Sequence, residues 1–280
     1  MANFFENQSA LIEWQKERMR LFHTKVQGYP EPVVENVTIL AYFYSLEHNS
    51  DEFFRVECAI RETWNQIGML HTVLVVNKNF EIVDLFAQKF ANVEIQVESS
   101  LVPGSTRPLS LDCICRLHTR FSTEYVLIVQ NDGFPLYGGK AFAKFVGPWD
   151  YIGGPWGGRL SYFDFFPYPG YAVGNGGFSL RSRRICRAAA EHWRGIVRLI
   201  VPYTNWFYED IYYTRALSVF VRGWRKMFNI APFDVAREFS LANKLPYPSK
   251  IPPMGFHSPD GFVEYMKLYG REVGLSHEGI

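Results

Sequence analysis

The sequence predicts an α/β protein with a mostly parallel central sheet flanked by helices. Short, continuously apolar runs of strand length alternate with helix-length segments through the first half of the chain, which is typical of a parallel sheet covered on both faces. The composition, with 48% hydrophobic and 20% charged residues, is that of a folded protein. A length of 280 residues suits one large domain, and no segment qualifies as a linker between independent domains.

Each expected element follows from its own residue pattern. An amphipathic helix over residues 10–22 ends before the Gly- and Pro-containing breaker at residues 28–32, so we expect residues 1–35 to be a helical appendage. Apolar runs predict strands over residues 37–44, 71–76, 93–97 and 125–130, and the segments around them predict helices over residues 51–66, 80–90, 109–118, 181–192 and 209–220. We expect the main domain at residues 36–262 and a C-terminal tail at residues 263–280.

Composition and patterning exclude several classes of protein. Lys and Arg number 29 against 28 Asp and Glu, so no global charge attracts nucleic acid, and we expect no nucleic-acid partner. No run approaches the ~18 apolar residues of a membrane-spanning helix, and the N-terminus does not resemble a secretory signal. We therefore expect a cytoplasmic protein, with the basic N-terminal helix as a candidate for peripheral contact with the cytosolic membrane face. The four cysteines contain no C-x-x-C pair and predict reduced, mostly buried thiols.

The polar residues after the strongest strand are the first candidate site. Gln130, Asn131 and Asp132 follow the apolar run 125–129 and precede Gly133. Ligands of open parallel sheets bind beyond the carboxyl ends of the strands. A carboxylate and an amide there can hold a hard divalent cation, which in turn holds a diphosphate. The alternative is a turn in which the side chains of Asn131 and Asp132 bond to backbone amides, and these residues alone favour the turn.

A glycine-rich segment is the second candidate site. Gly176 and Gly177, with Gly174, allow a ligand to approach the backbone closely, and Asn175 offers both a donor and an acceptor to sugar hydroxyls. The spacing matches neither a P-loop nor a dinucleotide-binding fingerprint. The alternative is a tight turn that leads into a strand, with Arg181 on a solvated face, and the segment favours neither interpretation.

Two further candidates lie later in the chain. Glu209 and Asp210 start a helix, where they either cap it or place one carboxylate as a base beside an acceptor hydroxyl. His257 stands between Phe and Ser, and by itself such a residue is more often structural than a metal ligand. Aromatic residues make up 17% of the chain and gather before residue 178 and around residues 206–213. We expect Trp156 and Trp206 to line a pocket.

The order of these segments resembles a known family. Five strings are similar, in the same order, to a family of uncharacterised bacterial and fungal proteins regarded as GT-A-type glycosyltransferases: Gln-Asn-Asp-Gly-Phe at 130–134, Trp-Asp-Tyr-Ile-Gly-Gly-Pro-Trp at 149–156, Gly-Asn-Gly-Gly-Phe-Ser-Leu-Arg at 174–181, Glu-Asp at 209–210 and Gly-Phe-His at 255–257. The resemblance covers about residues 37–261. It implies a GT-A-like single domain that moves a sugar from a nucleotide-sugar donor, with a UDP-sugar favoured, to a glycan or glycan-precursor acceptor, as in polysaccharide biosynthesis.

The resemblance also implies a cation site. Gln130, Asn131 and Asp132 stand where GT-A enzymes carry a D-x-D-type motif for the metal and the nucleotide diphosphate, and Gln130 departs from the first Asp of that motif. His257 stands where many such enzymes supply a second metal ligand. A mixed carboxylate and imidazole set suits Mn²⁺ better than Mg²⁺.

Catalytic and sugar-binding roles are implied in the same way. In inverting members the Glu-Asp pair supplies the catalytic base, which implies Asp210, with Glu209 in reserve. Donor or acceptor sugars are expected against Asn175, Gly176 and Gly177 and against the rings of Trp149, Tyr151, Trp156 and Trp206. Two alternatives stay open. A nucleotide-sugar hydrolase would share the donor site, and a non-catalytic glycan-binding module would use the same rings without needing Asp132, Asp210 or His257.

Overall fold

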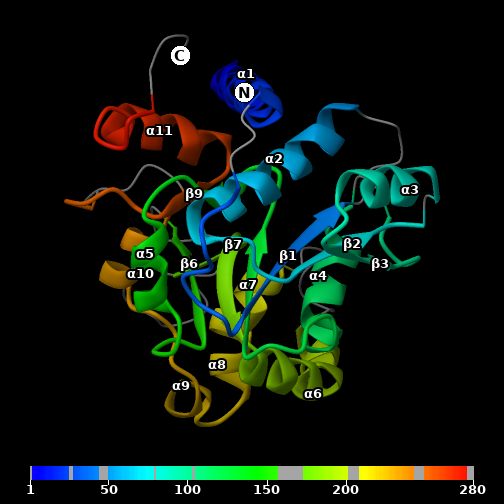
Figure 1. The fold of residues 1–280 in the computed structure, drawn as a ribbon. Helices are drawn as coiled ribbons and strands as arrows, with labels where there is room; N and C mark the ends of the chain where they lie inside the picture. Colours follow the sequence, from blue (N-terminus) through cyan, green and yellow to red (C-terminus); the bar gives the residue numbers. More distant parts are fainter. Residues whose placement is uncertain are drawn as a thin grey trace.

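The computed structural model describes residues 2–24, 28–43, 50–78, 80–102, 105–156, 173–200, 208–242 and 249–275 (Figure 1). Its strands are β1 (Val37–Phe43), β2 (Thr72–Val76), β3 (Val93–Val97), β4 (Tyr125–Val129), β5 (Gly133–Pro135), β6 (Tyr151–Pro155), β7 (Val173–Ser182), β8 (Ser240–Leu241) and β9 (Gly255–His257). Its α-helices are α1 (Ala2–Thr24), α2 (Ser50–Ile67), α3 (Phe80–Lys89), α4 (Thr106–Cys115), α5 (Gly139–Phe142), α6 (Arg183–Ile200), α7 (Glu209–Ile211), α8 (Leu217–Phe220), α9 (Trp224–Met227), α10 (Phe233–Phe239) and α11 (Pro259–Tyr269).

A six-stranded sheet forms the centre of the described part, with the strand order β3-β2-β1-β4-β7-β6. β1 pairs in parallel with β2 and β4, and β2 pairs in parallel with β3. β7 runs antiparallel to both β4 and β6. β1, β2 and β4 are buried at every position, which is why their sequences are continuously apolar. The mostly parallel α/β sheet predicted from the sequence is confirmed.

Helices cover both faces of this sheet (Figure 1). Alternate residues of β1 enter different apolar clusters, because successive side chains of a strand point to opposite faces. Ile39 and Phe43 pack with residues of α2 and α3, whereas Leu40 and Tyr42 pack with residues of α4 and α6. β5, β9 and β8 form a second, three-stranded sheet that begins where β4 ends.

The N-terminal helix is packed on the domain rather than appended to it. α1, drawn in blue in Figure 1, contacts α2 and also lies beside α11, which is drawn in red. Leu11 is fully buried, and the ring of Trp14 stacks on Phe134 with a centroid separation of 6.0 Å. The structure therefore differs from the expected appendage, because the apolar side of α1 is buried against the domain.

The C-terminal boundary also differs from the expected one. The boundary after residue 262 falls inside α11, and Tyr265 and Met266 are fully buried in the main apolar cluster. The expected tail thus starts with residues that complete the core.

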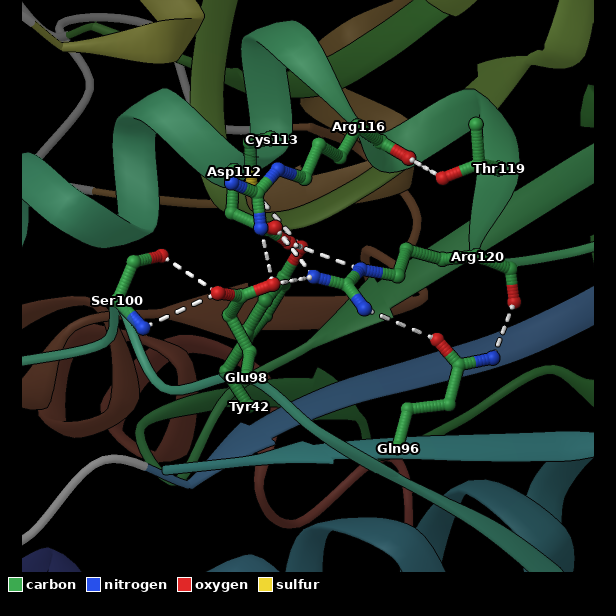
Figure 2. Close-up of polar contacts among 9 residues, drawn as sticks. All are labelled: Tyr42, Gln96, Glu98, Ser100, Asp112, Cys113, Arg116, Thr119 and Arg120. Carbon is green, nitrogen blue, oxygen red and sulfur yellow. Dashed lines mark hydrogen bonds and ion pairs between the residues drawn. The ribbon is translucent and has the colours of Figure 1, made fainter. Parts of the chain in front are cut away.

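A polar network ties the end of β3 to α4 and β1 (Figure 2). Arg120 donates to Glu98 Oε2 at 2.7 Å and pairs with Asp112, which also accepts a hydrogen bond from Tyr42 Oη at 2.9 Å. Burial raises the pKa of Glu98, but hydrogen bonds from Ser100 and from arginine side chains outweigh it and lower the pKa to about 2. The charged groups of this network thus form ion pairs and hydrogen bonds with one another and hold the end of β3 against α4.

Two further predictions from the sequence concern the cysteines and membrane-spanning helices. Cys58, Cys113, Cys115 and Cys186 are free thiols, and all except the partly buried Cys115 are buried, as predicted. Among the described helices, none combines the length and the apolar character that crossing a bilayer requires.

Candidate active site

The residues after β4 form a two-residue turn at the carboxyl end of the strand. Gln130 N–H donates to Gly133 O at 2.8 Å, and Gly133 N–H donates to Gln130 O at 3.0 Å. Asn131 and Asp132 thus occupy the two corner positions. The turn is closed by main-chain hydrogen bonds, and the Asp132 side chain keeps 26% of its surface exposed. The structure therefore has a turn at these residues, but main-chain hydrogen bonds close it instead of the side-chain bonds of Asn131 and Asp132 that the alternative expected.

β9 brings His257 to this turn. β5 and β9 pair antiparallel with Gly133 opposite His257. His257 Nε2 lies 3.7 Å from Asp132 Oδ1 and 3.3 Å from Gln130 Oε1. His257 Nδ1 is buried and has no hydrogen-bond partner among the described residues. His257 thus joins Gln130 and Asp132, more than 120 residues earlier in the chain, and the predicted metal ligands Asp132 and His257 lie side by side.

The converging atoms fit a divalent cation. A carboxylate oxygen, an amide oxygen and an imidazole nitrogen are all ligands that Mn²⁺ accepts. Two ligands bound at about 2.2 Å, between the bond lengths typical of Mg²⁺ and Ca²⁺, lie ~3–4 Å apart, as Asp132 Oδ1 and His257 Nε2 do. No group of three or more His, Cys, Asp or Glu side chains that could hold a metal occurs in the described part of the chain. The protein therefore offers two ionisable ligands here, with the Gln130 amide beside them.

β7 passes between this ligand set and the Glu-Asp pair of α7. A Cβ atom at Gly177 would lie 2.0 Å from His257 Nε2, whereas a Cβ atom at Gly176 would lie 2.2 Å from Glu209 Oε1. A side chain at either position therefore fits only if the facing side chain moves. The segment lies within β7 rather than in the tight turn considered as the alternative. Consecutive strand residues face opposite sides, so the two groups of candidate residues lie on opposite sides of this strand.

The two carboxylates that start α7 have different surroundings. Glu209 is only 7% exposed, accepts a hydrogen bond from Ser110 Oγ at 3.1 Å and pairs with Arg181 at 3.3 Å. Asp210 is less buried, and its Oδ1 accepts the backbone N–H of Ile211 at 2.7 Å. Burial and the charge of Glu209 raise the pKa of Asp210 to about 8, although the Ile211 hydrogen bond and Arg181 oppose the rise. The environment of Asp210 therefore favours the protonated form of its carboxyl more than water does.

Arg181 does not lie on the solvated face that one of the two interpretations of this segment expected. It is fully buried rather than on a solvated face, and its guanidinium carbon lies 5.1 Å and 4.8 Å from the ring centroids of Tyr151 and Tyr213. A buried guanidinium needs a counter-charge, which Glu209 provides. A buried arginine beside an acidic pair could have been suspected only by pairing the GNGGFSLR segment with the ED segment.

Of the aromatic residues expected to contact a sugar, Tyr151 belongs to the core, whereas Trp156 remains a candidate for the wall of a sugar-binding pocket. Tyr151 is fully buried and donates through Oη to Gly174 O at 2.6 Å, so the expectation that it forms a sugar-facing wall is wrong. Trp156 is partly exposed, and the Arg215 guanidinium lies 5.9 Å from its ring centroid. Asn175 lies in β7 and is 8% exposed. Trp206 lies outside the described residues.

Comparison with known proteins places these residues in a family. Residues 111–257, more than half of the chain, match a family described as "Protein of unknown function (DUF5672)". The match includes every predicted cation ligand and both carboxylates of α7. No protein with a curated description matches the sequence.

Solved structures show the fold. Mouse xyloside xylosyltransferase 1 in its apo form is similar with a TM-score of 0.55 and 10% identity over 80% of this chain and 98% of that chain. Core-mannan synthase A from Aspergillus fumigatus in its Mn/GDP form is similar with a TM-score of 0.50 and 9% identity over 90% of this chain and 92% of that chain. The fold is therefore the GT-A-like fold that the sequence resemblance implied.

Proposed function

We propose a glycosyltransferase function for this chain, which belongs to the DUF5672 family of proteins of unknown function. The observation that carries the proposal is the arrangement around β7, where the candidate cation ligand His257 meets Gly177 and Glu209, which directly precedes Asp210, meets the neighbouring Gly176. A GT-A-like fold shared with a xylosyltransferase and a mannan synthase supports it. The donor is a nucleotide sugar, and the acceptor is a hydroxyl of a glycan or glycan precursor.

The donor side of the proposed site is built on Asp132 and His257. These two side chains would hold the divalent cation, Mn²⁺ in preference to Mg²⁺, with the Gln130 amide beside them. When bound, the cation neutralises the negative charge on the leaving diphosphate. The imidazole of His257 occupies the space that a side chain at position 177 would need, so glycine there leaves room for it.

The acceptor side is built on Asp210. Its carboxylate takes the proton of the acceptor hydroxyl while that oxygen forms a bond to the anomeric carbon and the bond from this carbon to the diphosphate oxygen breaks. Attack from the face opposite the leaving group inverts the configuration. Glu209 is bound by Arg181 and Ser110, which favours Asp210 over Glu209 as the base. The partly exposed ring of Trp156 is the candidate wall for a sugar face.

The nucleotide is the first thing to establish. The sequence resemblance favours a UDP-sugar, whereas the Aspergillus fumigatus neighbour is in a GDP form, so both series belong in the assay. The protein is incubated with UDP- and GDP-sugars, with and without Mn²⁺, and with glycan acceptors. Mn²⁺-dependent transfer supports the proposal. Hydrolysis that no acceptor outcompetes would indicate a hydrolase, and glycan binding without any use of a nucleotide sugar would indicate a binding module.

Variants then test the assigned roles. We expect Asp132→Ala and Asp210→Asn each to lower transfer at least ~100-fold, the lower range of a general base contribution. Asp234→Asn is the matched control, because Asp234 lies in α10 with 79% of its side chain exposed. Near-normal transfer by Asp210→Asn, with loss in Asp132→Ala, would show that Asp210 is not the base.

A further inference from the structure

The turn that carries Asp132 is held from outside at both of its corner carbonyls. Gln15 Nε2 donates to Asn131 O at 2.7 Å, and Ser258 N–H donates to Asp132 O at 2.8 Å. Ser258 directly follows His257, so the second hydrogen bond joins the two proposed cation ligands through the main chain. The first comes from α1, 116 residues away in the sequence.

Gln15 is built into the protein as a fixed donor. Its side chain is fully buried, and its Oε1 accepts a hydrogen bond from Arg55 Nε in α2 at 3.0 Å. An arginine side chain can only donate, so this contact directs the amide oxygen to Arg55 and the NH₂ group to Asn131 O. One residue earlier, Trp14 stacks on Phe134, the second residue after the Asp132 corner. The buried face of α1 is thus directed at this turn.

The charged residues on the exposed face of α1 give less support to a role in membrane contact. Lys16 and Arg20, two of the basic residues that made this helix a candidate for membrane contact, form ion pairs with Glu13 and Glu17 of the same helix at 2.7 Å and 2.9 Å. Pairs of this kind leave little net positive charge for an anionic surface.

We propose that Gln15 is a positioning residue for the cation site. Through Asn131 O it fixes the turn, and with it the Asp132 carboxylate, at the 3.7 Å spacing from His257 that a shared cation needs. This role rests on the proposed function, since the spacing matters only if the two side chains share a cation. Residues that orient metal ligands from behind typically change metal affinity ~10–100-fold when they are replaced.

Gln15→Glu is the sharpest variant. The carboxylate keeps the size of the side chain and still accepts from Arg55, but it can no longer donate to Asn131 O. Lys16→Gln, one residue further on the same helix and exposed, is the control. Binding of Mn²⁺ alone is measured by electron paramagnetic resonance. We expect the Kd for Mn²⁺ to rise ~10–100-fold in Gln15→Glu and to stay unchanged in Lys16→Gln. A Kd within twofold of the wild-type value in Gln15→Glu would overturn the proposal.

Hydrogen exchange gives a readout that does not depend on the cation. We expect amides of residues 130–133 to exchange faster in Gln15→Glu while those of β2 keep their wild-type rate. Equal acceleration in both segments would show a merely structural role and overturn the proposal. If the wild-type protein binds no Mn²⁺, the proposed cation site fails, and unchanged exchange in the turn would then overturn the positioning role as well. If Gln15→Glu does not fold, Gln15→Met, which removes both hydrogen bonds without adding charge, is judged by the same two criteria.

Discussion

Replacing Gly177 with alanine tests whether the backbone of β7 sets the position of His257. The new Cβ atom would lie 2.0 Å from His257 Nε2 and 2.5 Å from Gln130 Oε1. Ordinary contact between such atoms is ~3.4 Å or more, so the imidazole would have to move by about 1.4 Å. A displacement of this size removes a ligand from a cation bound at ~2.2 Å. It also exceeds the ~1 Å misplacement that can lower catalysis ~100-fold.

The assay compares Gly177→Ala with Gly176→Ala, the same change one residue earlier. A Cβ atom at Gly176 meets Glu209 and Arg181 instead of His257. We expect Gly177→Ala to weaken Mn²⁺ binding at least ~100-fold, and Gly176→Ala to leave Mn²⁺ binding nearly unchanged while transfer falls. Both variants should lose ~1–3 kcal/mol of unfolding free energy in thermal or urea denaturation, the usual cost of overpacking. If Gly177→Ala binds Mn²⁺ as tightly as the wild type, the reasoning about His257 is refuted.

Three further predictions concern Asp210, Glu98 and Trp156. The pKa of about 8 for Asp210 predicts that kcat/KM rises from about pH 6, is half-maximal near pH 8 and levels off above about pH 9, because a base must first lose its proton; a flat profile over this range would contradict the assignment. The pKa of Glu98, about 2 against an ordinary 4.5, predicts stability that is present above pH 4.5 and is lost as the pH falls toward 2. Glu98→Gln should therefore lower the unfolding free energy by about 3 kcal/mol at pH 7 and by little at pH 2, and urea denaturation that shows equal losses at both pH values would count against this. Trp156→Ala should raise KM for a sugar substrate ~10-fold without changing Mn²⁺ affinity, and unchanged KM would remove Trp156 from the site.

The sequence predicted the structure best where complete burial makes every residue of a strand apolar. β1 and β4 are covered on both faces, so every position must be apolar, and such runs are visible without a partner. The polar residues Gln130 to Asp132 stand out because they interrupt the strongest of these runs. Their position at the carboxyl end of a parallel strand follows from the direction of the chain alone.

Contacts between distant segments were beyond what the pattern could predict. The amphipathic pattern of α1 indicated an apolar side but not the residues that this side packs against, and the hydrogen bond from Gln15 spans 116 residues. The sequence did not predict that Arg181 is buried, because its partner Glu209 comes from another element. In both cases the buried polar residue pairs with a polar group from a distant segment, and the local spacing of apolar residues contains no information about such a pair.

The central claim is that Asp132 and His257 hold a cation that binds a nucleotide diphosphate beside β7, and that Asp210 at the start of α7 is the base. A crystal structure with Mn²⁺ and a nucleoside diphosphate, with anomalous data collected at the manganese edge, tests it most directly. We predict an anomalous peak between Asp132 Oδ1 and His257 Nε2, with diphosphate oxygens bound to it. A diphosphate held elsewhere, or manganese bound without either side chain, would contradict the claim.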